Sequence, residues 1–217
     1  LAWAYGHCDV AVVRDLPCGE RDLCGFNPDV PADDTVTVGR ISAQDGRTVA
    51  VLLNYACHPT TLAWDNTLLS PDYIGAARET VETATGGLCL FLQGASGELS
   101  PSVQYVGDTG LADRYGRSVG YAALTAIESM APAGTVISFD GPVESGAPLA
   151  MWLPTPDGRA TELGWHRVNV PVHLKPERTA EEVAALWPHI DPRVAEERNR
   201  RAQRLRESYI GKGGTYH

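Results

Sequence analysis

Two short apolar runs, residues 49–53 and 88–92, constrain the fold of this chain more than any other feature. Each run is bounded by turn-forming residues, which is typical of a buried strand. Polar segments follow directly: Asn-Tyr-Ala-Cys-His-Pro-Thr-Thr over 54–61 and Gly-Ala-Ser-Gly-Glu-Leu-Ser-Pro over 94–101. Because open α/β sheets place ligand sites at the carboxyl ends of their strands, these segments predict a functional site at one sheet edge.

The neighbouring residues predict an α/β fold with mixed β-sheets and flanking helices. Asp45-Gly46 indicates a tight hairpin turn, since glycine tolerates positive φ. Ser70 followed by Pro71 indicates a helix start, with serine as the N-cap and proline at the first helical position. The predicted elements are strands 10–13, 35–41 and 48–55, a helix from 70 to 83, strand 88–92, a helix over 111–129 and strand 135–139. This order predicts parallel pairing of strands 48–55 and 88–92 through a right-handed crossover.

The two ends of the chain carry fewer chemical features. Residues 1–34 are predicted to form strand 10–13 followed by an irregular loop. The elements predicted near the other end are a Pro/Gly-rich loop over 141–164, a strand over 167–174, and helices over 179–187 and 192–209. We expect residues 1–144 to form the core of one domain and residues 145–217 to form a peripheral extension of that domain.

Charge and hydropathy exclude some functions. A chain of 217 residues that is 43% hydrophobic is long enough to bury a core. Its net charge of −9 argues against nucleic acid as a partner, because phosphate binding requires a basic face. No apolar stretch reaches the roughly 20 residues that cross a bilayer, so no transmembrane segment is expected. The start has no signal-peptide pattern, and the lack of an initiator Met predicts an internal fragment, which leaves secreted and cytoplasmic locations open.

The five cysteines show no metal-binding spacing. Cys57 and Cys89 lie in or beside the apolar runs and are predicted to be small buried hydrophobic residues. A single disulfide among Cys8, Cys18 and Cys24 stays open if the protein is exported.

His58 and Asp72 each allow two interpretations. His58 follows an apolar strand, where an imidazole can ligate zinc, act as a base, or simply bind a backbone carbonyl. Asp72 lies near a predicted helix start, where a carboxylate is stabilised by free N–H groups. Alternatively, the carboxylate of Asp72 orients the imidazole of His58 without contacting the ligand itself.

The segment after residue 92 holds three further candidates. Ser96 lies in a segment that follows the G-x-S-x-G pattern except at its last position, where Glu98 replaces the second glycine. Ser96 is therefore a poor candidate for a nucleophile. Glu98 and Ser100 are predicted to lie at the same sheet edge as His58, where they either contact substrate or stabilise the loop.

Five segments in order resemble the neutral/alkaline non-lysosomal ceramidase family, and its short bacterial members in particular. The segments are Val-Arg at 13–14, Phe-Asn-Pro-Asp at 26–29, the polar segment 54–61, Ser-Pro-Asp-Tyr-Ile-Gly at 70–75, and the stretch 91–101. The match covers about residues 5–130, whereas residues 145–217 match loosely. The resemblance implies a catalytic domain with one zinc ion, in which a zinc-activated water cleaves the amide of N-acylsphingosine or another small-molecule or lipid N-acyl substrate.

The resemblance also implies roles for individual residues. His58 falls where the family has a zinc-ligating His at a strand end. Ser100 falls where ceramidases have an active-site Ser in a Gly-Asp-x-Ser-Pro setting, and Glu98 replaces the Asp of that motif. The family's other zinc ligands, an upstream His and a downstream Glu and Tyr, have no counterpart in the matched segments. Because catalytic zinc needs about three protein ligands, we expect the isolated fragment to bind zinc weakly and to be inactive.

Three functions therefore compete. The first is a fragment of a zinc-dependent amide hydrolase, with further zinc ligands outside this fragment. The second is a non-catalytic ceramidase-like module that binds a lipid or carbohydrate surface. The third is a metal-free serine hydrolase that uses Ser100, His58 and Asp72. Residues that could line an apolar substrate groove are Trp64, Leu68, Leu69, Trp152 and Trp165.

Overall fold

The computed structural model describes residues 1–19, 21–158, 164, 166–170, 185, 193, 196, 197, 199–201, 203, 204 and 207. The chain divides into two compact units, Leu1–Ala160 and Thr161–His217. Residues 166–170 have no regular structure, so the start of the strand predicted over 167–174 is wrong, and the rest of that strand lies outside the described residues. The described residues from 185 onward are helical, and the helices predicted over 179–187 and 192–209 otherwise lie outside the described part.

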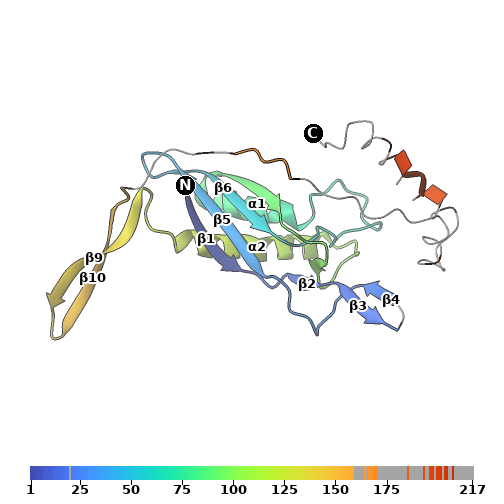
Figure 1. Cartoon of the computed structure of the whole chain (residues 1–217), viewed down its shortest axis with the longest axis horizontal. Helices are drawn as coiled ribbons and strands as arrows, with labels where there is room; N and C mark the ends of the chain where they lie inside the picture. Colours follow the sequence, from blue (N-terminus) through green and yellow to red (C-terminus); the bar gives the residue numbers. More distant parts are fainter. Residues whose placement is uncertain are drawn as a thin grey trace. The chain divides into compact units, whose positions relative to one another are not determined.

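A four-stranded sheet forms the centre of the first unit (Figure 1). Its order is β1 (Ala2–His7), β5 (Thr35–Ser42), β6 (Thr48–Tyr55) and β7 (Leu88–Gln93). The first two pairings are antiparallel and β6 pairs with β7 in parallel. The predicted hairpin and the predicted parallel pairing are confirmed, and Gly46 adopts the positive φ of 85° that the turn requires. The α/β fold class with mixed sheets is likewise confirmed.

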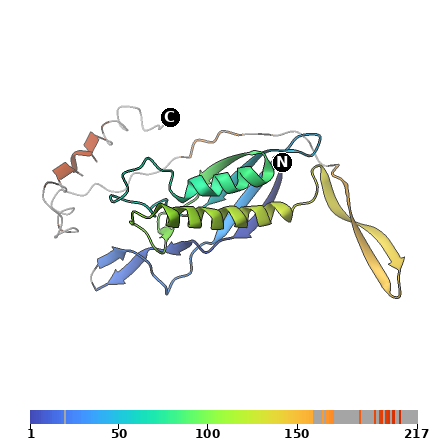
Figure 2. The same cartoon turned by 180° about the vertical axis from the view of Figure 1, so that it is seen from behind.

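Two helices, α1 (Tyr73–Thr85) and α2 (Thr109–Glu128), cover one face of this sheet (Figure 2). They pack against each other closely because α2 presents glycine at the contact: a Cβ on Gly116 would lie 2.2 Å from the carbonyl oxygen of Tyr73. Helix α1 begins later than predicted. Asp72, and not Ser70, is its N-cap, because the Asp72 side chain accepts from the backbone N–H of Tyr73.

The two faces of the sheet differ in burial. Side chains that point toward the helices, such as Val38, Leu53 and Cys89, are fully buried. Their neighbours on the opposite face, including Trp3 and Leu90, are exposed. This alternation follows from the pleat of a strand, in which successive side chains point to opposite faces.

Residues 1–34 hold more regular structure than the predicted strand 10–13 and the irregular loop predicted after it. Strand β1 alternates small and large side chains and pairs along the whole of its length with β5. Two short ladders follow: β2 (Ala11–Val13) pairs with β8 (Leu99–Pro101), and β3 (Asp15–Cys18) pairs with β4 (Arg21–Cys24).

The predicted loop over 141–164 is wrong in its first part. Strands β9 (Thr135–Glu144) and β10 (Pro148–Pro156) form an antiparallel hairpin that turns at Gly146, whose φ is 73°. Proline residues in the sequence of this hairpin had indicated a loop. A two-stranded ribbon tolerates proline because each strand has one edge that donates no ladder hydrogen bond.

Candidate functional site at the carboxyl edge of the sheet

The two polar segments that follow β6 and β7 lie side by side. Because these strands are parallel, their carboxyl ends meet at one sheet edge, and Tyr55 pairs with Gln93 at the end of the ladder. The N–H of Gly94 then donates to the carbonyl of Tyr55 at 3.0 Å. Further on, the N–H of His58 donates to the carbonyl of Leu99 at 2.9 Å. The predicted meeting of His58 with the segment that carries Ser100 is therefore present in the backbone.

Glycine is required where the two segments meet. A Cβ on Gly94 would lie 2.9 Å from the Cβ of Ala56 and 3.0 Å from its Cα. Any larger residue would therefore push the segment after β7 away from the segment after β6. This close approach explains the role of the glycine that directly follows β7.

Side-chain atoms without a hydrogen-bond partner concentrate at this edge. Within the described residues, four buried side-chain nitrogen or oxygen atoms lack a partner, and three of them are His58 Nδ1, Thr61 Oγ1 and Ser100 Oγ. The fourth is Nε of Arg40. Leaving a buried polar atom unpaired costs about 1–3 kcal/mol, so three such atoms at one edge mark it as the candidate site.

The carbonyl immediately before His58 is held by two side chains. Tyr73, which follows the N-cap of α1, donates its hydroxyl to the carbonyl of Cys57 at 2.7 Å. Gln93, the last residue of β7, donates to the same carbonyl at 2.9 Å and to the hydroxyl of Ser96 at 2.7 Å. These bonds fix the backbone from which His58 projects. Burial raises the pKa of the Tyr73 hydroxyl above its usual range, so Tyr73 stays protonated as a donor.

Ser100 lies in the middle of β8 and is fully buried. Glu98, two residues earlier, has an exposed side chain, and its backbone carbonyl accepts from the N–H of Arg14 at 2.8 Å. Within the described residues the Glu98 carboxylate makes no hydrogen bond or ion pair. The hydroxyl of Ser100 is thus buried, whereas the carboxylate of Glu98 is exposed.

Asp72 does not bond to His58. One of its carboxylate oxygens accepts from the N–H of Tyr73 at 2.7 Å, and the other accepts from the N–H of Leu62 at 2.8 Å. The carboxylate therefore caps α1 and fastens the segment after His58 to the helix. The interpretation in which Asp72 orients His58 is wrong in this structure, and the arrangement of a Ser100–His58–Asp72 triad is not formed. Asp72 adopts a φ of 56°, a conformation that is uncommon for a residue with a side chain.

Sequence reasoning missed two residues of this edge: Tyr73 and Gln93. Each lies within or beside the segments already singled out, and Gln93 is the first polar side chain after an apolar strand. Tyr73 was hidden inside an expected helix, where an aromatic residue is most simply explained as packing.

The five cysteines are all free, so the alternative of a disulfide among Cys8, Cys18 and Cys24 is not realised. Cys57 and Cys89 are buried as predicted. Burial is the main cause that raises the pKa of Cys57 to about 12 and that of Cys89 to about 11. Neither is a thiolate at neutral pH.

A zinc ion fits this chain only in part. Within the described residues, no three His, Cys, Asp or Glu side chains gather closely enough to hold a metal ion. His58 Nδ1 is a buried imidazole nitrogen without a partner, which is the property that a ligand atom needs. Since catalytic zinc is held by about three protein groups, His58 fits as one ligand of a site that further residues complete.

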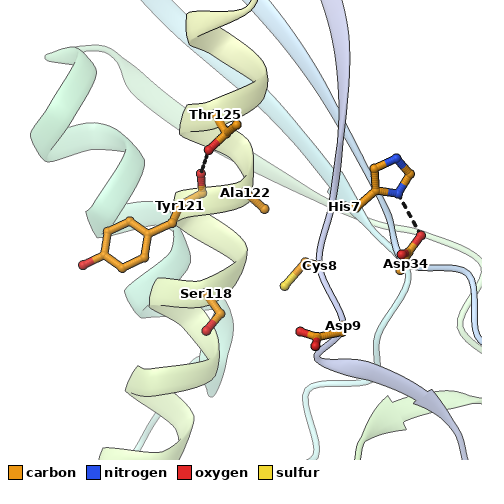
Figure 3. Close-up of a pocket in the computed structure, with 8 residues that line it drawn as sticks. All are labelled: His7, Cys8, Asp9, Asp34, Ser118, Tyr121, Ala122 and Thr125. Atoms are coloured by element: carbon orange, nitrogen blue, oxygen red, sulfur yellow. Dashed lines mark hydrogen bonds and ion pairs between the residues drawn. The ribbon is translucent and has the colours of Figure 1, made fainter.

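A separate hollow of about 370 Å³ lies between the end of β1 and helix α2 (Figure 3). His7 and Asp34 form one wall and bond to each other at 2.9 Å between Nδ1 and Oδ1. Helix α2 forms the other wall through residues that include Ser118 and Thr125. None of the candidate residues at the carboxyl edge lines this hollow, so it is not part of that site.

Comparisons with known proteins found similarity only among solved structures. No family model and no curated protein matches it. Two solved structures are similar: a ceramidase complexed with C2 and the neutral ceramidase from Pseudomonas aeruginosa. Each has a TM-score of 0.47 and 17% identity and covers 68% of this chain. The chain spans 27% of the length of the first and 28% of the second.

Proposed function

We propose that this chain forms part of the catalytic domain of a ceramidase-like hydrolase, in which His58 is one ligand of a zinc ion. The observation that carries the proposal is the set of unpartnered atoms His58 Nδ1, Thr61 Oγ1 and Ser100 Oγ at one sheet edge. The segments that hold them are those that resemble the ceramidase family in order and spacing. The reaction is hydrolysis of an amide in N-acylsphingosine or another N-acyl substrate.

Bound zinc would supply a water of lowered pKa, near 7, and would polarise the amide carbonyl. His58 offers Nδ1 to the metal from a backbone that Tyr73 and Gln93 hold through the carbonyl of Cys57. These bonds fix the position of the backbone from which the imidazole would reach the metal.

Ser100 and Glu98 act on the substrate in this proposal. The buried hydroxyl of Ser100 donates to the carbonyl oxygen as negative charge develops there, a role that commonly contributes 10²–10³-fold to the rate. The exposed carboxylate of Glu98 stands at the rim, where it can carry a proton toward the departing amine. Water adds to the carbonyl carbon, the C–N bond breaks, and the products are a carboxylic acid and an amine.

A second candidate function is a non-catalytic module that binds a lipid or carbohydrate surface. It is favoured by the absence, within the described residues, of three metal-ligating side chains in one place. It is also favoured by the exposed indole of Trp64, which stacks on Tyr105. In this alternative, His58 and Ser100 bind a ligand without catalysing its hydrolysis.

The experiment that separates the two is hydrolysis of N-acylsphingosine by the full-length protein loaded with zinc, compared with its Ser100→Ala variant. We expect hydrolysis by the natural sequence and a fall of about 10²–10³-fold in kcat in the variant, with its zinc content unchanged. Ser102→Ala, which changes an exposed serine two residues away, is the matched control and should keep full activity. Absence of hydrolysis in the zinc-loaded natural protein would favour the binding module.

A further inference from the structure

The loop over residues 62–71, between the candidate site and helix α1, exposes large apolar side chains. Trp64 is 78% exposed, Leu68 is 66% exposed, and Leu69 is fully exposed. The three lie within six consecutive positions. Large exposed apolar groups are costly when they gather in one place, and they mark surfaces that contact another apolar phase.

The loop that carries these side chains is internally bonded. The Asn66 side chain donates to the carbonyl of Leu68 at 2.8 Å and accepts from the N–H of Leu68 at 3.1 Å. The backbone N–H of Asn66 also donates to the carbonyl of Ala63 at 3.0 Å. These bonds close a turn around Asn66, so the loop presents Leu68 and Leu69 to solvent from a defined backbone.

Trp64 is also held in place. Its ring stacks on that of Tyr105, with 5.8 Å between the centroids and 12° between the planes. The Tyr105 hydroxyl lies 3.2 Å from the Cys24 sulfur, and this bond is the main cause that raises the pKa of Tyr105. Tyr105 adopts a φ of 60°, which is strained for a tyrosine and is kept because its neighbours fix it. The indole is thus held against the protein on one side while most of its surface stays open.

The charge of the loop indicates which kind of lipid surface it suits. Asp65 is its single charged residue, and it contains no Lys or Arg. Binding to anionic lipid headgroups relies on basic residues, so this loop does not suit an anionic surface. An indole beside two leucines suits the interface of an uncharged membrane, because tryptophan favours the headgroup level and leucine the acyl region.

We propose that residues 62–71 dock the protein on a zwitterionic lipid surface, with Trp64, Leu68 and Leu69 entering the interface. This inference rests on the proposed function and names the surface on which that site works. The loop begins directly after Thr61 and ends directly before Asp72, and the Asp72 carboxylate binds the N–H of Leu62. Docking of the loop therefore brings the edge that carries His58 and Thr61 to the lipid, where an N-acyl lipid can reach it.

The test is cosedimentation of the full chain with phosphatidylcholine vesicles that contain no substrate. We expect the natural sequence to bind and the double variant Leu68→Ser/Leu69→Ser to show a partition coefficient lower by about tenfold or more. The control is Val143→Ser/Leu149→Ser, which removes two aliphatic side chains, 49% and 45% exposed, that pair with each other on the β9–β10 hairpin. This control should bind like the natural sequence.

Tryptophan fluorescence gives a second test. Brominated phosphatidylcholine should quench the tryptophan fluorescence of Trp64→Phe less than that of the natural sequence.

Three results would overturn the inference. The first is absence of binding by the natural sequence, and the second is equal binding by the loop variant and the hairpin variant. The third is a concentration-dependent dimer that Leu68→Ser/Leu69→Ser dissociates, because the loop would then contact a second copy. Hydrolysis of a water-soluble short-chain N-acyl amide by the full-length protein reports separately on the proposed function, since it needs no lipid surface.

Discussion

The two faces of the central sheet show how the same strands serve different purposes. Cys89 and Leu90 are neighbours in β7, yet the first is completely buried against the helices and the second is 45% exposed on the opposite face. The ladder places Trp3, Gly39, Leu52 and Leu90 in one row across that opposite face. Parallel strands are usually covered on both faces. In this sheet, helices α1 and α2 cover one face, and the opposite face is exposed.

Composition alone does not tell which side chains stabilise this fold. Both faces are rich in apolar residues, and β7 is apolar on both of its sides. The helix-covered face carries the packing energy, because only burial removes apolar surface from water. Among the described residues, no helix is long and apolar enough to cross a membrane.

The largest expected effect comes from a matched pair in β6. Leu53→Ala removes a fully buried side chain and should lower the free energy of unfolding by about 3 kcal/mol. Leu52→Ala makes the same chemical change one residue away, on the open face, and should cost about 1 kcal/mol or less. Urea denaturation of both variants measures the difference. Equal losses would show that the open face is covered in solution and would break the comparison.

The contact between the helices gives the next largest effect. Gly116→Ala places a Cβ within 2.2 Å of the Tyr73 carbonyl oxygen, so α2 must move away from α1 at an expected cost of about 2–3 kcal/mol. The control is Gly110→Ala in the first turn of α2, where the nearest atom is a side-chain oxygen of Asp108 at 3.2 Å. It should leave the free energy of unfolding unchanged or raise it by up to about 1 kcal/mol. Thermal unfolding of the two variants decides between these outcomes, and similar midpoints would contradict the close packing.

The buried thiols predict a smaller, pH-dependent effect. Burial raises the pKa of Cys57 from 9.0 to about 12, so above pH 9 the unfolded chain loses this proton while the folded chain keeps it. The contribution of this thiol to the free energy of unfolding is therefore fully present below pH 9. It is lost as the pH rises toward 12, by about 1.4 kcal/mol per pH unit. Denaturation at pH 8 and pH 10 should show a larger loss in the natural sequence than in Cys57→Ala. Cys18→Ala, which removes an exposed thiol, should follow the natural sequence.

The elements that the sequence predicts well have local causes. The hairpin of β5 and β6 follows from Asp45-Gly46, and β7 follows from five consecutive apolar residues bounded by turn-formers. Strand β1 was missed because its alternation is between small and large side chains, and not between polar and apolar ones. Its partner, β5, lies about thirty residues away, so the pairing depends on a tertiary contact that no local pattern contains.

The sequence predicted at which edge of the sheet the candidate site lies, but not which contacts hold its residues. Two strands that end in polar segments predict that His58 and Ser100 approach each other, because parallel strands end together. The identity of the N-cap was not predictable from Ser70 and Pro71, since Asp72 is held by a backbone contact to Leu62, ten residues earlier. The roles of His58, Ser100 and Glu98 stay predictions.

The most direct test of the central claim is the zinc content of the full-length protein and of its His58→Ala variant. His7→Ala is the control, because His7 bonds to Asp34 at a place that shares no residue with the candidate site. The account predicts close to one zinc per chain in the natural protein and in His7→Ala, with a severe loss in His58→Ala. A well-folded natural protein without zinc, or one in which His58→Ala keeps its zinc, would contradict it.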